Sequence, residues 1–295
     1  MAKTNYDVNG NEIKIDDKTE KERLAAFEQI SKKAILINMT RKQISNMPFD
    51  VISSQKCAKL LKVKDESLIQ VRKFLFNPEH LSKIRSLIND GLLMVWTHTR
   101  PWDNIGYRLL PMEYYDDFNE TFGKIKDEFE EAVKEFTDNY DTYLAESKKN
   151  LGDAFNKNDY PDKTQLNQYF ELKISTTTFP DIDDIRLNMS GPELMQMQKE
   201  ITDKYTGTIK ESVEEILKFI ESGNHTMAYD LLKVTDKLNV SNDPEIELKI
   251  AEIKAELKAT GNIVVDKEKK EVTEESMMVM DDINDIDDII DDYGL

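Results

Sequence analysis

Six basic residues stand close together between residues 56 and 73 of the sequence. They are Lys56, Lys59, Lys62, Lys64, Arg72 and Lys73. Residues 31–100 hold 13 lysines and arginines against 5 aspartates and glutamates, so this run belongs to a wider basic region. Ammonium and guanidinium groups in such a run pair with nucleic-acid phosphates or with acidic proteins. The run is therefore a candidate interaction surface.

The segment from Thr99 to Pro111 combines aromatic with basic side chains. Arg100 and Arg108 alternate there with Trp102 and Tyr107. Aromatic rings that stack bases, next to cations that pair phosphates, are typical of single-strand nucleic-acid binding. The alternative is that Trp102 and Tyr107 close the end of a helical bundle while the two arginines bridge acidic neighbours.

The C-terminal stretch from Asp281 to Asp292 holds seven aspartates and no lysine or arginine. Its apolar side chains recur at helical spacing, at Ile283, Ile286, Ile290 and Tyr293, and Asp287 and Asp288 lie between them. A purely solubilising tail needs no isoleucines. We therefore expect a docking motif that folds into a groove on a basic partner, or onto the basic third of the chain itself.

Catalytic and cofactor-binding motifs are missing from the sequence. It contains no Gly-rich phosphate loop followed by lysine, no dinucleotide fingerprint and no Gly-x-Ser-x-Gly elbow. The three histidines, His80, His98 and His225, stand far apart, and Cys57 is the single cysteine. A zinc site needs several such ligands at close spacing. The sequence predicts a non-enzymatic protein with no cofactor and no metal.

A cluster of acidic residues follows Pro180. Asp181, Asp183 and Asp184 are read as a solvated loop, with a weak Mg²⁺ or Ca²⁺ site as the alternative. The net charge of −18 is concentrated beyond residue 100, where the sum is −24. That imbalance leaves a third class of function open, an acidic mimic of nucleic acid that inhibits a host enzyme.

Hydrophobic periodicity predicts a mainly α-helical fold. The strongest stripe runs from Tyr115 to Leu144, and a second one runs from Leu194 to Ile220. The simplest way to bury both is a long antiparallel, coiled-coil-like helix pair within an elongated bundle. A strand at Glu171–Phe179 could form a small hairpin with residues Ile185–Asn188.

Shorter periodic segments predict the remaining helices. One begins at Thr19 and ends before Pro48, since Ala34 and Ile37 continue its apolar spacing. The others span Ser54–Leu61, Glu66–Phe76, a segment opened by Asn77-Pro78-Glu79 that Gly91 interrupts, Thr226–Leu238 and Pro244–Ala259. The segment from Thr99 to Pro111 reads as a loop between two prolines.

Four regions follow from this pattern. We expect a flexible arm at residues 1–18, a basic helical region at 19–111, a long-helix bundle with a small strand insert at 112–260, and a disordered acidic tail at 261–295. No segment approaches the roughly 20 apolar residues of a membrane span. With no apolar signal core at the N-terminus, we expect a cytoplasmic protein.

The run Thr99-Arg100-Pro101-Trp102, the run Gly106 to Pro111, the Phe/Tyr-striped helix and Tyr160-Pro161 together resemble an uncharacterised family of phage and bacterial proteins of about this length. The resemblance covers residues 35–190. Members of that family are encoded near MoxR-type AAA+ ATPases and proteins with von Willebrand factor A domains. The resemblance implies a phage-type origin, hence a host cytoplasm, and an ATPase-linked partner, and it carries over no catalytic residue.

Two hypotheses of different class follow for the whole chain. The first is a phage-type helical adaptor whose acidic tail recruits another protein, an AAA+ ATPase by the resemblance. The second is a nucleic-acid-binding accessory protein that uses the basic run and the Trp102 segment. Salt dependence separates them, because contacts to phosphates release counterions, whereas docking through isoleucines does so much less.

Overall fold

The computed structural model describes residues 5–6, 12–13, 17–103, 105–179, 191–240 and 243–259. The chain divides into two compact units, Met1–Ala255 and Glu256–Leu295, and of the second only residues 256–259 are described. The predicted strand at Ile185–Asn188, the Asp181–Asp184 cluster and the acidic tail lie outside the described residues. None of the described helices combines the length and the apolar character that a membrane span requires.

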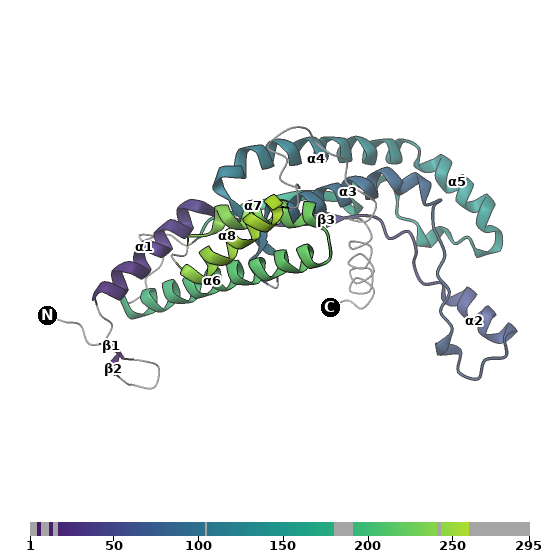
Figure 1. Cartoon of the computed structure of the whole chain (residues 1–295). Helices are drawn as coiled ribbons and strands as arrows, with labels where there is room; N and C mark the ends of the chain where they lie inside the picture. The colour runs from purple at the N-terminus through teal and green to yellow at the C-terminus, as the bar shows by residue number, and fades with distance from the viewer. Residues whose placement is uncertain are drawn as a thin grey trace. The chain divides into compact units, whose positions relative to one another are not determined.

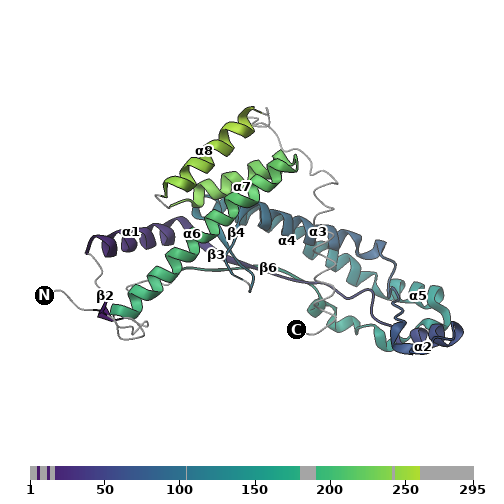
Figure 2. The same cartoon turned by 60° about the horizontal axis from the view of Figure 1, so that its bottom comes forward.

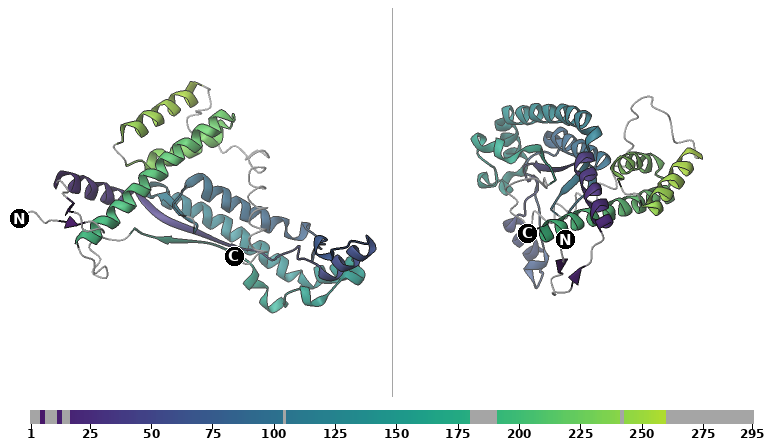
Figure 3. Two further views of the ribbon diagram at one scale, coloured as in Figure 1. Left: turned by 90° about the horizontal axis from the view of Figure 1, so that it is seen from below. Right: turned by 90° about the vertical axis from the view of Figure 1, so that its left-hand side faces the viewer.

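The fold of the first unit is mainly helical, as predicted, with a small antiparallel sheet. The strands are β3 (Ala34–Lys42), β4 (Arg100–Pro101), β5 (Tyr107–Pro111) and β6 (Glu171–Thr177), in the order β4-β5-β3-β6. The strand β3 pairs Ile35 with Leu110 on one side and Met39 with Ile174 on the other. Figure 2 and the left view of Figure 3 show β3 and β6 running side by side. A separate two-stranded ladder joins β1 (Asn5–Tyr6) to β2 (Glu12–Ile13).

The largest core lies between the sheet and two helices, α3 (Glu79–His98) and α4 (Tyr115–Asp138), which run side by side in Figure 1. Gly91 lies where α3 crosses the sheet. A Cβ there would meet the side chains of Met39 at 3.1 Å, Phe122 at 3.6 Å and Leu172 at 3.7 Å. Gly91 therefore allows α3 to pack closely against the sheet and against α4. It does not interrupt α3, contrary to the prediction.

The predicted pairing of the two long stripes is wrong. The aromatic stripe of α4 is buried against α3, whereas α6 (Gly191–Glu221) packs along α7 (His225–Leu238) and α1 (Asp17–Lys33). Periodicity shows that a face is buried but does not identify the element that covers it. The stripe from Tyr115 to Leu144 is also divided between two helices, because α4 ends at Asp138 and α5 (Tyr140–Leu151) follows after Asn139.

Two shorter predictions are corrected as well. The first helix ends at Lys33, and Ala34 and Ile37 belong to β3, because the apolar run of residues 34–37 satisfies a strand as well as a helix. The segment Thr99–Pro111 contains β4 and β5 and is not a plain loop. The strand predicted at Glu171–Phe179 is confirmed as β6, which pairs with β3, and its predicted partner at residues 185–188 lies outside the described residues.

Residues Glu66–Phe76 form only a short 3-10 helix, η1 (Glu66–Leu68), and then an extended segment, so the helix predicted there is wrong. The helices predicted at Thr226–Leu238 and Pro244–Ala259 are confirmed as α7 and α8 (Pro244–Ala259). Helix α2 (Val51–Leu60) confirms the one predicted at Ser54–Leu61. The sheet joins the two predicted regions 19–111 and 112–260, because β3 belongs to the first region and its partner β6 to the second. The remaining short 3-10 segments are η2 (Met112–Tyr114), η3 (Gly152–Ala154), η4 (Lys157–Asp159) and η5 (Lys163–Tyr169).

Candidate interaction surfaces

The basic run lies on a segment that leaves the core and returns to it, residues 46–76, which we call the α2 excursion. Its two ends are tied together at Asn46, whose side chain accepts from the Phe76 N–H at 2.7 Å and donates to the Phe76 carbonyl at 3.0 Å. Phe76 is buried against the rings of Phe136 and Tyr160 at 5.3 and 5.2 Å. The excursion therefore starts from a fixed base in the main core.

Helix α2 begins at Asp50, which caps it. The Asp50 carboxylate accepts from the Ser53 N–H at 2.9 Å, and the Asp50 N–H donates to the Val71 carbonyl at 2.8 Å. The Ser54 hydroxyl donates to the Asp50 carbonyl and accepts from the Val71 N–H. These bonds hold α2 against the returning extended segment.

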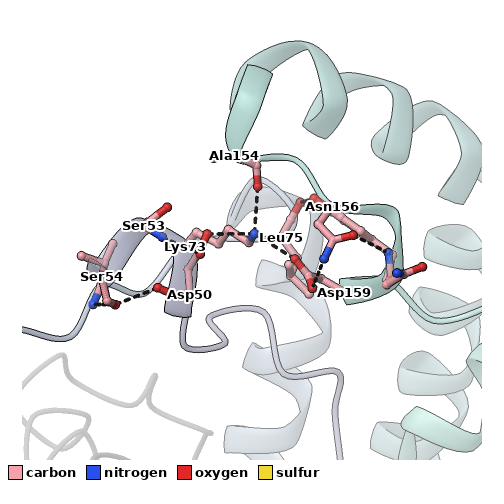
Figure 4. Close-up of polar contacts among 11 residues, drawn as sticks. Asp50, Ser53, Ser54, Lys73, Leu75, Ala154, Asn156 and Asp159 are labelled. Carbon is pink, nitrogen blue, oxygen red and sulfur yellow. Dashed lines mark hydrogen bonds and ion pairs between the residues drawn. The ribbon is translucent and has the colours of Figure 1, made fainter. Parts of the chain in front are cut away.

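Lys73 joins the excursion to the segment that follows α5, as Figure 4 shows. Its Nζ lies 2.9 Å from an Asp50 carboxylate oxygen, 2.8 Å from an Asp159 carboxylate oxygen and 2.8 Å from the Ala154 carbonyl. The three acceptors match the three ammonium donors.

The pKa values of this centre follow from its contacts. Burial alone would raise the pKa of Asp50, but the Ser53 N–H and Lys73 outweigh burial and hold it below 3.8. Burial alone would lower the pKa of Lys73, and the two carboxylates, Asp159 and Asp50, raise it above 10.5. Both groups are therefore charged at neutral pH. Lys73, predicted as a nucleic-acid contact, is instead occupied by these three partners.

Large apolar side chains are exposed all over the excursion. Of the twelve exposed ones in the described residues, eight lie here, namely Met47, Phe49, Val51, Ile52, Leu60, Leu61, Leu68 and Phe74. Leu60 is 81% and Ile52 is 61% exposed. Exposed apolar side chains scattered singly are ordinary, but a contiguous group marks an interaction site. We call these eight residues, together with Lys56, Lys59, Lys62 and Lys64, the α2 surface.

Helix α2 buries its small side chains and exposes its large apolar ones, which is the opposite of an ordinary surface helix. Ser54 and Ala58 are its buried residues, while Val51, Ile52 and Leu60 face solvent. A helix that only covered a core would bury its branched apolar residues. Hydrophobic periodicity does not predict this surface. A signal for it is nevertheless present in the sequence, because the adjacent pairs Val51-Ile52 and Leu60-Leu61 fit no single buried face.

Four of the predicted basic residues lie on the same surface. Lys56, Lys59, Lys62 and Lys64 are all exposed, and none makes an ion pair with another residue in the described ranges. Arg72 is exposed at the returning segment. The structure thus brings these basic side chains together with the apolar cluster and separates them from Arg100, Trp102, Tyr107 and Arg108.

Those four residues belong to the hairpin of β4 and β5. Its turn is closed by the Asp103 carboxylate, which accepts from the N–H groups of Ile105 and Tyr107 at 3.1 and 2.9 Å. The Trp102 ring packs edge-on against Phe179 at 5.4 Å, and Lys204 Nζ lies 4.4 Å from its centroid. These neighbours make Trp102 a packing residue between the hairpin and α6.

Trp102→Ala is therefore expected to lower the free energy of unfolding by about 2 kcal/mol or more, because it leaves space beside Phe179 and Tyr205. Thermal or urea unfolding of the variant measures this loss. An unchanged melting temperature together with weaker single-strand binding would instead show that the ring is kept for stacking bases.

Arg100 and Arg108 lie at the base of the hairpin. Arg100 is fully buried, and its Nη1 contacts a Glu215 carboxylate oxygen at 3.3 Å, while its Nε and Nη2 have no hydrogen-bond partner among the described residues. Arg108 donates from Nε to the Thr99 hydroxyl at 2.6 Å. Burial lowers the pKa of each arginine to about 10, and Glu215 only partly offsets this. Arg100 is therefore not available to a nucleic-acid phosphate.

No described residues form a group of three or more His, Cys, Asp or Glu side chains that could hold a metal ion. His80 stacks on Tyr143 at 3.8 Å and contacts Glu146 at 3.0 Å, whereas His98 contacts the Met94 carbonyl. A groove of about 550 Å³ lies between α4 and β6, lined by apolar residues such as Phe129 and by lysines and glutamates. The lysines at its rim, Lys126 and Lys134, are paired within α4.

Comparison with known proteins adds no relative: no family model, no curated protein and no solved structure matches this chain. The resemblance in residues 35–190 therefore stays a prediction. The α2 surface and the β4–β5 hairpin are the features that bear on the function.

Proposed function

We propose that this chain is a non-enzymatic, phage-type adaptor that binds a protein partner through the α2 surface. The observation that carries the proposal is the concentration of exposed apolar side chains on one firmly anchored segment, next to lysines that form no ion pair within the described ranges. Burying a large aliphatic side chain is worth roughly 1.5 to 3 kcal/mol, so Ile52 and Leu60 alone offer a substantial part of a specific interface.

The anchoring supports this reading. The α2 excursion is held by the Lys73 centre and by the Asn46–Phe76 bonds, so its surface is ordered before any partner arrives. A preorganised surface binds more tightly because little ordering entropy is lost on association. An exposed apolar surface that served no partner would bring an aggregation liability and no benefit.

The acidic stretch is the second contact element of the proposal. Ile283, Ile286 and Ile290 are spaced to line one side of a helix, with Asp287 and Asp288 between them. In this proposal the stretch docks on a basic protein, and the resemblance supports an AAA+ ATPase as the kind of partner. A substitution of the three isoleucines by serine keeps every charge, so it separates apolar docking from simple attraction.

Single-strand nucleic-acid binding is the second candidate, because Phe49 and Phe74 are half exposed on the same surface as the lysines. Exposed rings beside ammonium groups could stack bases and pair phosphates. If three lysines met phosphates, the logarithm of affinity would fall with that of salt with a slope of about −2. A docking protein with aliphatic contacts should show a much weaker dependence.

The adaptor proposal is tested by affinity capture with the full chain. Ile52→Asp combined with Leu60→Asp is expected to reduce recovery of the principal protein partner roughly tenfold, the loss that about 1.4 kcal/mol produces. Both side chains are exposed, so the fold should remain intact.

Leu248→Asp is the matched control, since Leu248 is 60% exposed on α8. It should leave recovery unchanged. Equal recovery with the α2 variant and with wild type would reject the α2 surface as the adaptor's contact site.

A further inference from the structure

The exposed face of α2 is a broad stripe. Positions 51, 52, 55, 56, 59 and 60 are all exposed, and at 3.6 residues per turn they cover about half of the helix circumference, with Ile52, Lys56 and Leu60 four residues apart along one row. Apolar side chains occupy the two ends of this stripe, with Lys56 and Lys59 between them. A helix of 10 residues presents a stripe about 15 Å long, which matches about three turns of a second helix.

Among the described residues, no carboxylate forms an ion pair with Lys56 or Lys59. Asp50 is engaged by Lys73 and the Ser53 N–H, and Asp65 accepts from the hydroxyl and the N–H of Ser67 at 2.6 and 3.1 Å. These carboxylates are thus bonded within the excursion. Lys56 and Lys59 therefore present a positive field to whatever covers Ile52 and Leu60.

We propose that the α2 surface takes an acidic amphipathic helix, whose apolar stripe packs on Ile52 and Leu60 and whose carboxylates pair with Lys56 and Lys59. This inference rests on the proposed adaptor function and names the class of its partner. Charge complementarity selects an acidic ligand over a basic one. The aliphatic character of the α2 stripe selects a protein helix over nucleic acid, because phosphates and sugars would not bury these side chains.

The sequence of residues 276–295 is a suitable probe, because it combines the aspartates with the isoleucines at helical spacing. A labelled synthetic peptide of this sequence is added to the full chain in which Ile283, Ile286 and Ile290 are replaced by Ser. The substitutions keep every charge and stop the chain's own stretch from competing through apolar contacts. Fluorescence anisotropy then gives the affinity.

We expect saturable binding that weakens about tenfold when Ile52→Ser and Leu60→Ser are added to the protein. A peptide with the same three isoleucines replaced by serine should also bind about tenfold more weakly. Lys56→Glu combined with Lys59→Glu should also weaken binding. This variant tests the charge contacts separately from the apolar contacts. Leu248→Ser should change nothing. Circular dichroism and the melting temperature confirm that each variant is folded.

Equal binding of the two peptides would overturn the inference, since attraction of charge alone would then explain it. Binding that ignores both sets of α2 substitutions, or no binding, would also overturn it. Self-association of the wild-type chain that the α2 substitutions abolish would support it, with a second copy as the source of the helix. If partner capture depends on the α2 surface but the peptide does not bind, the inference fails and the adaptor function stands.

Discussion

Lys73→Met is expected to lower the free energy of unfolding by about 3 to 5 kcal/mol, although it replaces a single lysine in a basic run. Asp50 is buried, so the substitution leaves a carboxylate in the protein without its counter-charge. Asp159 and the Ala154 carbonyl lose their donor at the same time. Urea denaturation followed by circular dichroism measures the change.

Lys59→Met is the matched control, because Lys59 is exposed and makes no ion pair with any described residue. Its effect should stay within about 0.5 kcal/mol. Adding Asp50→Asn to Lys73→Met should recover part of the loss, since the unpaired charge is then removed. A loss below about 1 kcal/mol for Lys73→Met would contradict the assignment of this centre as the anchor of the excursion.

The same centre gives the protein a dependence on pH. The folded protein holds the pKa of Asp50 below 3.8, so ionised Asp50 contributes stability that is present above this value. That contribution is lost as the pH falls through the lower, folded pKa. The difference in stability between wild type and Asp50→Asn should therefore shrink on acidification below about pH 4.

The helices with their own periodic stripe could be predicted from the sequence, and the contacts between distant segments could not. Helices α7 and α8 appear where their apolar spacing places them. The apolar spacing of β3 predicts the end of a helix, whereas its strand conformation depends on pairing with β6, far along the chain. Local pattern carries no information about such a partner.

The same limit applies to the candidate sites. The sequence shows the basic run but does not distinguish Lys73 from Lys59. The acceptors around Lys73 include Asp159 and the Ala154 carbonyl, which come from a distant segment. Exposure of Ile52 and Leu60 was equally hidden. A sequence shows that apolar residues are present, and only the fold shows that Ser54 and Ala58 occupy the buried face instead.

Glu215→Gln and Arg100→Met should change stability in opposite directions, although each removes one member of the same ion pair. Two guanidinium groups lie near one carboxylate at the base of the hairpin, and two nitrogens of Arg100 find no hydrogen-bond partner in the described part of the chain. A fall of the arginine pKa from 12.5 to about 10 corresponds to a cost of about 3 kcal/mol for keeping that charge in the fold.

Glu215→Gln leaves both arginines buried without a counter-charge, so we expect a loss of about 3 kcal/mol. Arg100→Met removes the fully buried charge, fills similar space with an apolar side chain and leaves Glu215 to Arg108, and Glu215 itself remains partly in water. We expect this variant to equal or exceed wild type by about 1 to 3 kcal/mol. Urea unfolding of both variants decides the matter. A large loss for Arg100→Met would mean that the unpartnered nitrogens bind a group in solution, and that Arg100 stabilises the fold through it.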